Sequence, residues 1–235
     1  MRRSLRLFGE FRREQTDPER FYTVLAADTA AQVATYVDLE GQLVLDLGSG
    51  PGFFRRAFTA AGARHVALEF DVEELTRFGG STESSVIGSG MALPFRDGSI
   101  DVAFSSNVLE HVTDPWRMAS EMLRVTRPGG IVFLSYGPWW GPWGGHDTAP
   151  WHYLGGHYAR RRFVRKHGRE PRNKYGDTLF KTTVRDGLAW AADQRDAELL
   201  AAFPRYNPRW SWWVLRIPLV REVVTWNLVL VLRKA

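Results

Sequence analysis

The stretch Val44-Leu45-Asp46-Leu47-Gly48-Ser49-Gly50-Pro51-Gly52 decides the fold of this 235-residue chain. Its first residues, Val44 to Leu47, form a short apolar run with one acid, which is typical of a buried parallel strand. Three glycines follow at alternate positions, and glycine accepts positive φ and lets a ligand approach the backbone closely. The residues from Phe53 onward read as the start of a helix. Strand, glycine turn and helix together predict the opening of a nucleotide-binding α/β unit.

The spacing of the glycines indicates which class of nucleotide is bound. The dinucleotide fingerprint G-x-G-x-x-G would need glycine at position 53, where this chain has Phe53. The spacing here is G-x-G-x-G, preceded by Asp46 at the end of the strand. The segment from Asp46 to Gly52 therefore resembles the first motif of class I S-adenosylmethionine (SAM) dependent methyltransferases.

Composition limits the remaining choices. The length suits one α/β domain with a proper core, and a hydrophobic content of 44% is ordinary for a globular protein. Without cysteine, disulfides, thiolate chemistry and cysteine-ligated zinc sites are excluded. A net charge of +5 favours an anionic partner or surface. The basic N-terminus lacks the apolar stretch of about 7–15 residues that a signal peptide needs, so we expect a cytoplasmic protein.

A helix is predicted before the glycine turn. Asp17 is the expected N-cap and Pro18 the first helical residue. Apolar residues then recur at helical spacing from Phe21 to Val37, and Gly41 is the expected end. Two interpretations are open: the helix is a lid over the cofactor site, or it covers one face of the sheet.

Glu69 ends the second predicted strand, His65 to Glu69. It follows the glycines at close to the roughly 20-residue spacing at which an acid meets a ribose in such folds. A carboxylate can accept hydrogen bonds from both ribose hydroxyls, so Glu69 is the predicted ribose ligand. The alternative is a solvated strand end. Phe70, the next residue, is placed to lie against the face of an adenine.

Three further motifs extend the resemblance to residues 42–136. Ser89 to Phe95 is similar to the family's adenine loop, although Ser89 stands where the family usually has an aspartate, and a hydroxyl accepts more weakly than a charged group. Ser105 to Val112 is similar to the segment that faces the methyl group, and Arg127-Pro128-Gly129-Gly130 precedes an apolar strand. The resemblance implies SAM as cofactor and S-adenosylhomocysteine (SAH) as product. It implies cofactor contacts from Asp46, Gly48, Ser49, Gly50, Gly52, Glu69, Phe70, Ser89, Gly90, Met91 and Asn107.

The family's fold is a three-layer α/β/α Rossmann-like sandwich. Its sheet has seven mostly parallel strands with an antiparallel last strand. The expected organisation is a single domain over residues 1–235. It comprises an N-terminal helical lid (1–41), a SAM-binding core (42–136), a substrate-side insertion (137–182), and a C-terminal helix with closing strands (183–235).

Three histidines are candidate general bases, because the imidazole pKa lies near operating pH. They are His111, which follows the fourth strand, and His146 and His152 in the insertion. Structural packing is the alternative role for each. His146, Asp147, His152 and His157 could together suggest a metal site, but their spacing matches no recognised ligand pattern. The family needs no metal for sulfonium transfer, so none is predicted.

The insertion is rich in tryptophan and then strongly basic from Arg160 to Arg185. This combination favours O-methylation of a small-molecule, glycan or lipid-linked acceptor. The alternatives are an RNA or tRNA methyltransferase, since arginine and aromatic side chains also stack on bases, and a non-catalytic SAM-binding scaffold, given Ser89.

The segment Trp210 to Val220 carries both tryptophans and charges. A membrane span needs about 20 apolar residues, and Arg216 and Pro218 interrupt this stretch. Two readings stay open: the segment lies in a membrane interface as a peripheral contact, or it packs against the protein's own sheet.

Overall fold

The computed structural model describes residues 2–11, 16–76 and 84–235. Seven strands form one sheet in the order β3-β2-β1-β4-β5-β7-β6. Strands β1 to β5 are parallel, and β7 runs antiparallel to both β5 and β6. The predicted sheet is thereby confirmed. The strands are β1 (Leu43–Leu47), β2 (Arg64–Glu69), β3 (Ser85–Ile87), β4 (Ile100–Ser106), β5 (Thr126–Tyr136), β6 (Ala197–Pro204) and β7 (Leu228–Lys234).

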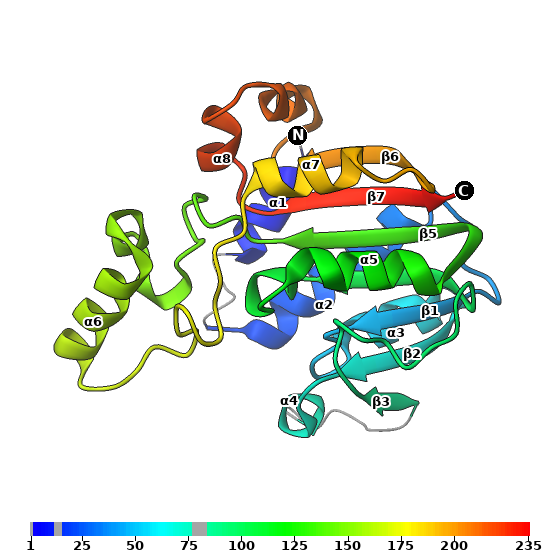
Figure 1. Cartoon of the computed structure of the whole chain (residues 1–235), viewed down its shortest axis with the longest axis horizontal. Coiled ribbons are helices and arrows are strands. Elements are labelled where there is room, and N and C mark those ends of the chain that lie inside the picture. Colours follow the sequence, from blue (N-terminus) through cyan, green and yellow to red (C-terminus); the bar gives the residue numbers. More distant parts are fainter. Residues whose placement is uncertain (1, 12–15, 77–83) are drawn as a thin grey trace.

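Helices cover both faces of the sheet (Figure 1). Successive residues of a strand point to opposite faces, so Leu45 joins one buried cluster and Val44 the other. The Leu45 cluster includes residues of α5 (Pro115–Val125) and α7 (Val184–Ala192). The Val44 cluster includes residues of α2 (Pro18–Val33) and α3 (Phe53–Ala60). This is the three-layer sandwich that the sequence predicts.

The carboxyl ends of the parallel strands meet at one edge of the sheet, on the side from which the 137–182 insertion projects (Figure 1). The insertion contains η3 (His146–Thr148), η4 (Trp151–Leu154) and α6 (Gly156–His167). The sequence predicts the Trp-rich loop but not α6, whose basic sequence lacks a clear apolar stripe. The remaining helices are α1 (Arg2–Phe11), α4 (Val72–Thr76), η2 (Leu109–His111), η5 (Arg209–Arg216) and α8 (Val220–Val224).

The N-terminal helix α2 begins where the sequence predicts. The Asp17 side chain accepts a hydrogen bond from the Arg20 amide at 3.2 Å, and Pro18 is the first helical residue. The helix ends at Val33 rather than continuing toward Gly41, because the later apolar residues are held in a turn. Its buried side chains pack against α3 and the sheet, as the second interpretation proposes. Tyr22 also stacks on Phe53 directly after the glycine turn, with ring centroids 5.5 Å apart.

Two strand boundaries differ from the predicted ones. Strand β5 already begins at Thr126, and pairing jumps from Ile100–Thr126 to Val102–Ile131, so the R-P-G-G segment bulges within the strand. The sequence also predicts a closing strand over Val224 to Arg233, but strand β7 begins at Leu228, because Val224 ends α8. The β7 error occurs because a short apolar run does not distinguish the end of a helix from the start of a strand. The β5 error occurs because proline and glycine in R-P-G-G indicate a turn rather than a bulge within a strand.

Candidate functional site

The glycine turn joins β1 to α3 at the carboxyl edge of the sheet. Gly48, Gly50 and Gly52 have φ values of +70°, +51° and +84°, which L-residues rarely adopt. A Cβ at Gly48 would lie 2.3 Å from Val108 Cγ2, so this glycine lets the segment after β4 pack onto the turn. A Cβ at Gly50 would meet nothing within 4 Å. The turn therefore presents bare backbone to open space, which suits the close approach of a ligand.

Glu69 ends β2 and reaches the glycine turn. Its Oε2 accepts a hydrogen bond from the Gly50 amide at 3.0 Å, and its Oε1 accepts one from the Phe70 amide at 2.9 Å. A carboxylate offers about four lone-pair sites, so these two bonds are compatible with further bonds to ribose hydroxyls. The predicted ribose ligand thus lies beside the turn after β1. The strand order reverses between β1 and β4, and α/β folds bind nucleotides at such a reversal.

Ser49 of the turn and Asp46 of β1 are both buried. Ser49 is 5% exposed, and its Oγ has no hydrogen-bond partner among the described residues. An orphaned buried hydroxyl is costly, and a polar group of the cofactor at the turn would satisfy it. Asp46 is 1% exposed with Oδ2 3.2 Å from His65 Nε2, so it supports the turn from within the sheet. These residues fit the cofactor that the resemblance implies.

The predicted adenine side is formed by Phe70 and the loop after β3. Phe70 is 78% exposed, which leaves its ring available to a ligand. Ser89 Oγ accepts a hydrogen bond from the Met91 amide at 3.2 Å, so these two groups bond to each other inside the loop. Because the Met91 amide is already bonded, the Gly90 amide is favoured over it as the predicted contact to the adenine. The loop is held to α5, because Arg117 Nε donates to the Met91 carbonyl at 2.9 Å.

A polar cluster that the sequence did not predict lies at the ends of β4 and β5. Arg205 is fully buried, and its Nη1 and Nη2 donate to Ser106 Oγ at 3.0 Å and Ser135 Oγ at 2.9 Å. Burial lowers the pKa of this guanidinium. Asn107, the predicted neighbour of the sulfonium, has φ +59° and accepts a hydrogen bond from Asn227 Nδ2 at 2.7 Å. Serines at the ends of two apolar strands were the signal in the sequence.

The structure brings two of the three candidate bases together. The rings of His111 and His146 lie 5.1 Å apart between centroids. His111 Nδ1 is 2.7 Å from the Thr178 carbonyl oxygen, which can only accept, so Nδ1 donates, and in the neutral ring Nε2 carries the lone pair. Burial, followed by the nearby His111, lowers the pKa of His146 to about 3. His152 is fully buried and donates from Nε2 to the Gly141 carbonyl, which favours its packing role.

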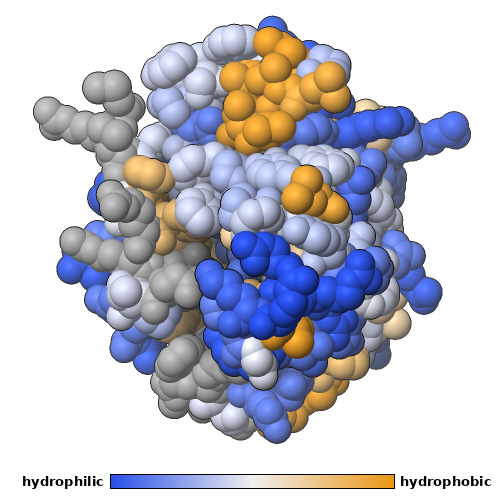
Figure 2. All heavy atoms as spheres, turned by 90° about the vertical axis from the view of Figure 1, so that its left-hand side faces the viewer, coloured by the Kyte–Doolittle hydropathy of each residue, from blue (hydrophilic) through white to orange (hydrophobic). Residues whose placement is uncertain are grey.

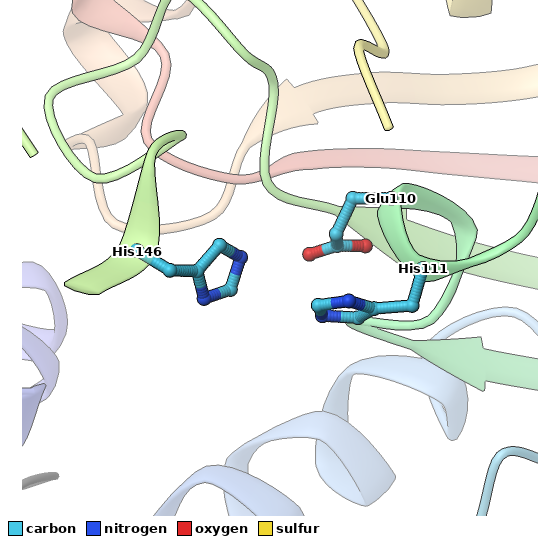
Figure 3. Close-up of side chains that lie close together, drawn as sticks. All are labelled: Glu110, His111 and His146. Atoms are coloured by element: carbon cyan, nitrogen blue, oxygen red, sulfur yellow. The ribbon is translucent and has the colours of Figure 1, made fainter. Parts of the chain in front are cut away.

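Glu110 joins this pair, although the sequence gave no reason to assign it a role. Its carboxylate is 2% exposed, its Oε1 accepts from the Gly137 amide at 2.9 Å, and burial raises its pKa. One ligating atom each of Glu110, His111 and His146 lies within 4.8 Å of the others (Figure 3). Among the described residues, the set His146, Asp147, His152 and His157 does not bring its ligating atoms together; Asp147 accepts from the Arg172 amide, and His157 packs edge-on against Tyr175.

A pocket of about 340 Å³ opens where the insertion meets α7. Lys181 lies over the Trp140 ring, with Nζ 4.6 Å from the centroid. The wall combines an aromatic ring with two basic and two acidic side chains, so it is polar but not strongly charged. The lining residues are Trp140, Lys181, Thr183, Arg185, Asp186 and Glu222.

Comparisons with known proteins agree with this geometry. A family model described as a methyltransferase domain matches residues 45–134. A protein named as an uncharacterized methyltransferase from Mycobacterium sp. strain KMS is 53% identical, over 98% of this chain and 94% of the relative. A protein of the same description from Mycobacterium tuberculosis H37Rv is 51% identical, over 99% of this chain and 94% of the relative.

Solved structures show the same fold at low sequence identity. A SAM-dependent methyltransferase from Mesorhizobium loti superposes with a TM-score of 0.61 at 19% identity, covering 88% of this chain and 98% of the other. A geranyl diphosphate C-methyltransferase from Streptomyces coelicolor, in complex with Mg²⁺, geranyl diphosphate and SAH, superposes with a TM-score of 0.58 at 14% identity. That match covers 94% of this chain and 87% of the other.

Proposed function

Since the chain belongs to the SAM-dependent methyltransferases, we propose that it methylates a hydroxyl oxygen of a small-molecule, glycan or lipid-linked acceptor. SAM supplies a methyl group that its sulfonium has already activated. The protein's task is then to hold the acceptor oxygen in line behind that methyl group. Positioning of this kind can remove several kcal/mol of the barrier, up to about 7–11 kcal/mol.

In this proposal the cofactor binds at the carboxyl edge of the sheet, and the residues there have separate roles. Glu69 binds the ribose, and the bare backbone at Gly50 with the buried Ser49 hydroxyl accommodates the amino-acid half. Phe70 and the loop from Ser89 to Met91 flank the adenine, and Asn107 lies near the sulfonium. In this assignment Asp46 is a positioning residue, because its carboxylate is buried against His65.

The observation that carries the acceptor assignment is the meeting of the insertion with the carboxyl edge of the sheet. His146 of the insertion faces His111, and the free Nε2 of His111 is suited to accept a proton from a hydroxyl. Aromatic and basic side chains of the insertion pair along the walls of two pockets, with Arg162 over Trp151 at 3.9 Å and Lys181 over Trp140. Such walls suit an acceptor that combines apolar surface with an anionic group.

Transfer of labelled methyl groups into cell extract tests this proposal. Purified protein with methyl-labelled SAM is incubated with extract, and the extract is then separated into lipid, glycan, RNA and small-molecule fractions. We expect label outside the RNA fraction, in a methyl ether identified by mass spectrometry. Label in RNA, with RNA binding that weakens steeply with salt, would contradict the proposal in favour of a nucleic-acid methyltransferase. SAH binding without any transfer would instead favour a scaffold.

A lipid-linked acceptor is favoured by an exposed apolar surface formed by η5 and α8. Trp210, Trp213 and Leu219 are 71%, 53% and 81% exposed, whereas Trp212 stacks on Phe203 of the protein's own sheet. Figure 2 shows a hydrophobic patch at the top of the face on which α8 lies. Within residues 2–11, 16–76 and 84–235, no helix has the length and apolar character to cross a bilayer. Contact with a membrane would therefore be peripheral.

Co-sedimentation with anionic vesicles measures this contact. We expect the double variant Trp210→Ala/Trp213→Ala to lower the vesicle partition coefficient by about tenfold or more, because two large apolar surfaces no longer enter the interface. Ile87→Ala is the matched control, since Ile87 is 51% exposed on β3 at the opposite edge of the sheet. Equal partitioning of the wild type and the double variant would contradict the proposal that this surface contacts a membrane.

A further inference from the structure

The cluster of Glu110, His111 and His146 has the composition of a metal site. One ligating atom from each residue lies within 4.8 Å of the other two. Two imidazoles with one carboxylate form a set that binds Zn²⁺ and other first-row divalent metals, with positions left open for a substrate. Figure 3 shows the Glu110 carboxylate and the His111 ring facing the His146 ring across a shared space.

The carboxylate of Glu110 gives independent support. Its Oε1 is bound to the Gly137 amide, but its Oε2 is buried and has no hydrogen-bond partner among the described residues. A buried carboxylate oxygen without a partner is costly. A cation at the centre of the cluster would satisfy this oxygen. Neither the predicted cofactor contacts nor the proposed general base accounts for it.

Both histidines are prepared as ligands. His111 donates from Nδ1 to the Thr178 carbonyl, and metal-ligating histidines characteristically donate their second ring nitrogen in this way. That bond fixes the tautomer and leaves Nε2 as the donor to a metal. His146 has φ +47°, a strained conformation for a residue with a Cβ. Strain of this kind concentrates where a side chain must be aimed at a ligand.

We propose that Glu110, His111 and His146 bind one divalent transition-metal ion of the Zn²⁺ or Mn²⁺ class. The two imidazoles argue against Mg²⁺ and Ca²⁺, which prefer oxygen ligands. Metal–nitrogen bonds of about 2.1 Å bring ligating atoms to roughly 3.4 Å from each other. That spacing lies within the 4.8 Å limit inside which the three ligating atoms are found. His146 belongs to the insertion, so the ion also ties the insertion to the edge of the sheet.

The open positions of the ion would hold the acceptor, and this role rests on the proposed function. Val108 packs on Gly48, so η2 carries Glu110 and His111 next to the cofactor turn. With the ion bound, Nε2 of His111 is a ligand, and this role replaces that of the general base proposed for it. A hydroxyl bound to the metal would have a lowered pKa and would lose its proton to solvent. Its oxygen forms the new bond to the methyl carbon while the carbon–sulfur bond breaks and the electron pair stays on sulfur. The products are a methyl ether, SAH and one proton.

Titration of the metal-free protein with Co²⁺ tests the site directly, because Co²⁺ bound by nitrogen and oxygen ligands absorbs visible light. We expect one equivalent per chain, with affinity at least tenfold lower in Glu110→Gln and in His146→Ala. Glu110→Gln keeps an acceptor for the Gly137 amide, so it preserves that contact. His157→Ala, a histidine of the same insertion that packs on Tyr175, is the control and should bind Co²⁺ like the wild type.

Thermal melting of each variant establishes that it is folded, and calorimetric titration with SAH on the same samples separates the two hypotheses. No Co²⁺ binding by a wild type that binds SAH would overturn the metal site and leave the methyltransferase assignment intact. Binding of Co²⁺ that Glu110→Gln and His146→Ala leave unchanged would also overturn it. Co²⁺ binding with the expected variant effects supports the site, whether or not acceptor oxygen methylation is found.

Discussion

Gly50→Ala is expected to weaken SAH binding by about 10- to 100-fold while the protein stays folded. A Cβ at this position meets no protein atom within 4 Å, so the free protein has room for it. The cofactor is proposed to occupy that room, and forcing an extra methyl group into a packed contact costs about 1–3 kcal/mol. Calorimetric titration with SAH measures the affinity, and thermal melting measures the stability.

Gly41→Ala is the matched control for this substitution. Gly41 also has a left-handed φ, +70°, and its Cβ would likewise meet nothing within 4 Å, but it lies between α2 and β1. Both substitutions carry the same backbone penalty of about 1–2 kcal/mol for an L-residue in this region. If both variants lose stability equally and bind SAH like the wild type, the open side of the turn is not a cofactor surface.

Glu69→Ala is expected to weaken SAH binding by about 100-fold or more. A hydrogen bond to a charged group contributes about 1.5–3 kcal/mol, and the proposal gives Glu69 two such bonds to the ribose. Glu73→Ala on α4 is the control, because Glu73 is an exposed carboxylate on the helix that follows β2. It should bind SAH with the affinity of the wild type.

Loss of affinity in Glu69→Ala has a second cause that must be separated from the first. The carboxylate also accepts from the Gly50 amide, so its removal loosens the turn. An SAH analogue without the ribose 2′-hydroxyl distinguishes the two causes. Removing the hydroxyl from the ligand and the carboxylate from the protein, singly and together, forms a double-mutant cycle that measures the coupling between them. The analogue should bind the wild type more weakly than SAH does, and the two compounds should bind Glu69→Ala alike. An equal penalty in both proteins would mean that Glu69 does not contact the ribose.

The core of the fold was predictable because its signals are local. The strand, the alternate glycines and the acid ending the next strand lie close together in the sequence, and Asp17 and Pro18 mark the start of α2 in the same way. The spacing of apolar residues alone did not determine where some helices and strands end. The apolar residues after Val33 continue to face the core in a turn, so their spacing overstated the length of α2.

The other features depend on contacts between distant segments. Glu110 and His146 belong to different elements, and only the folded insertion brings them together. Arg205 donates to serines at the ends of β4 and β5, and those serines alone did not indicate that an arginine 70 or 99 residues away would be their partner. Adjacent tryptophans behave differently for the same reason: Trp212 stacks on Phe203, whereas Trp213 faces outward. The acceptor side is consequently less predictable than the cofactor side.

A crystal structure of the complex with SAH tests the central claim most directly. The account predicts SAH at the carboxyl edge of β1, β2 and β4, with its amino-acid half over Gly50. Its ribose hydroxyls should then lie within about 3 Å of the Glu69 carboxylate. Density for SAH at another part of the molecule, or a ribose directed away from Glu69, would contradict it.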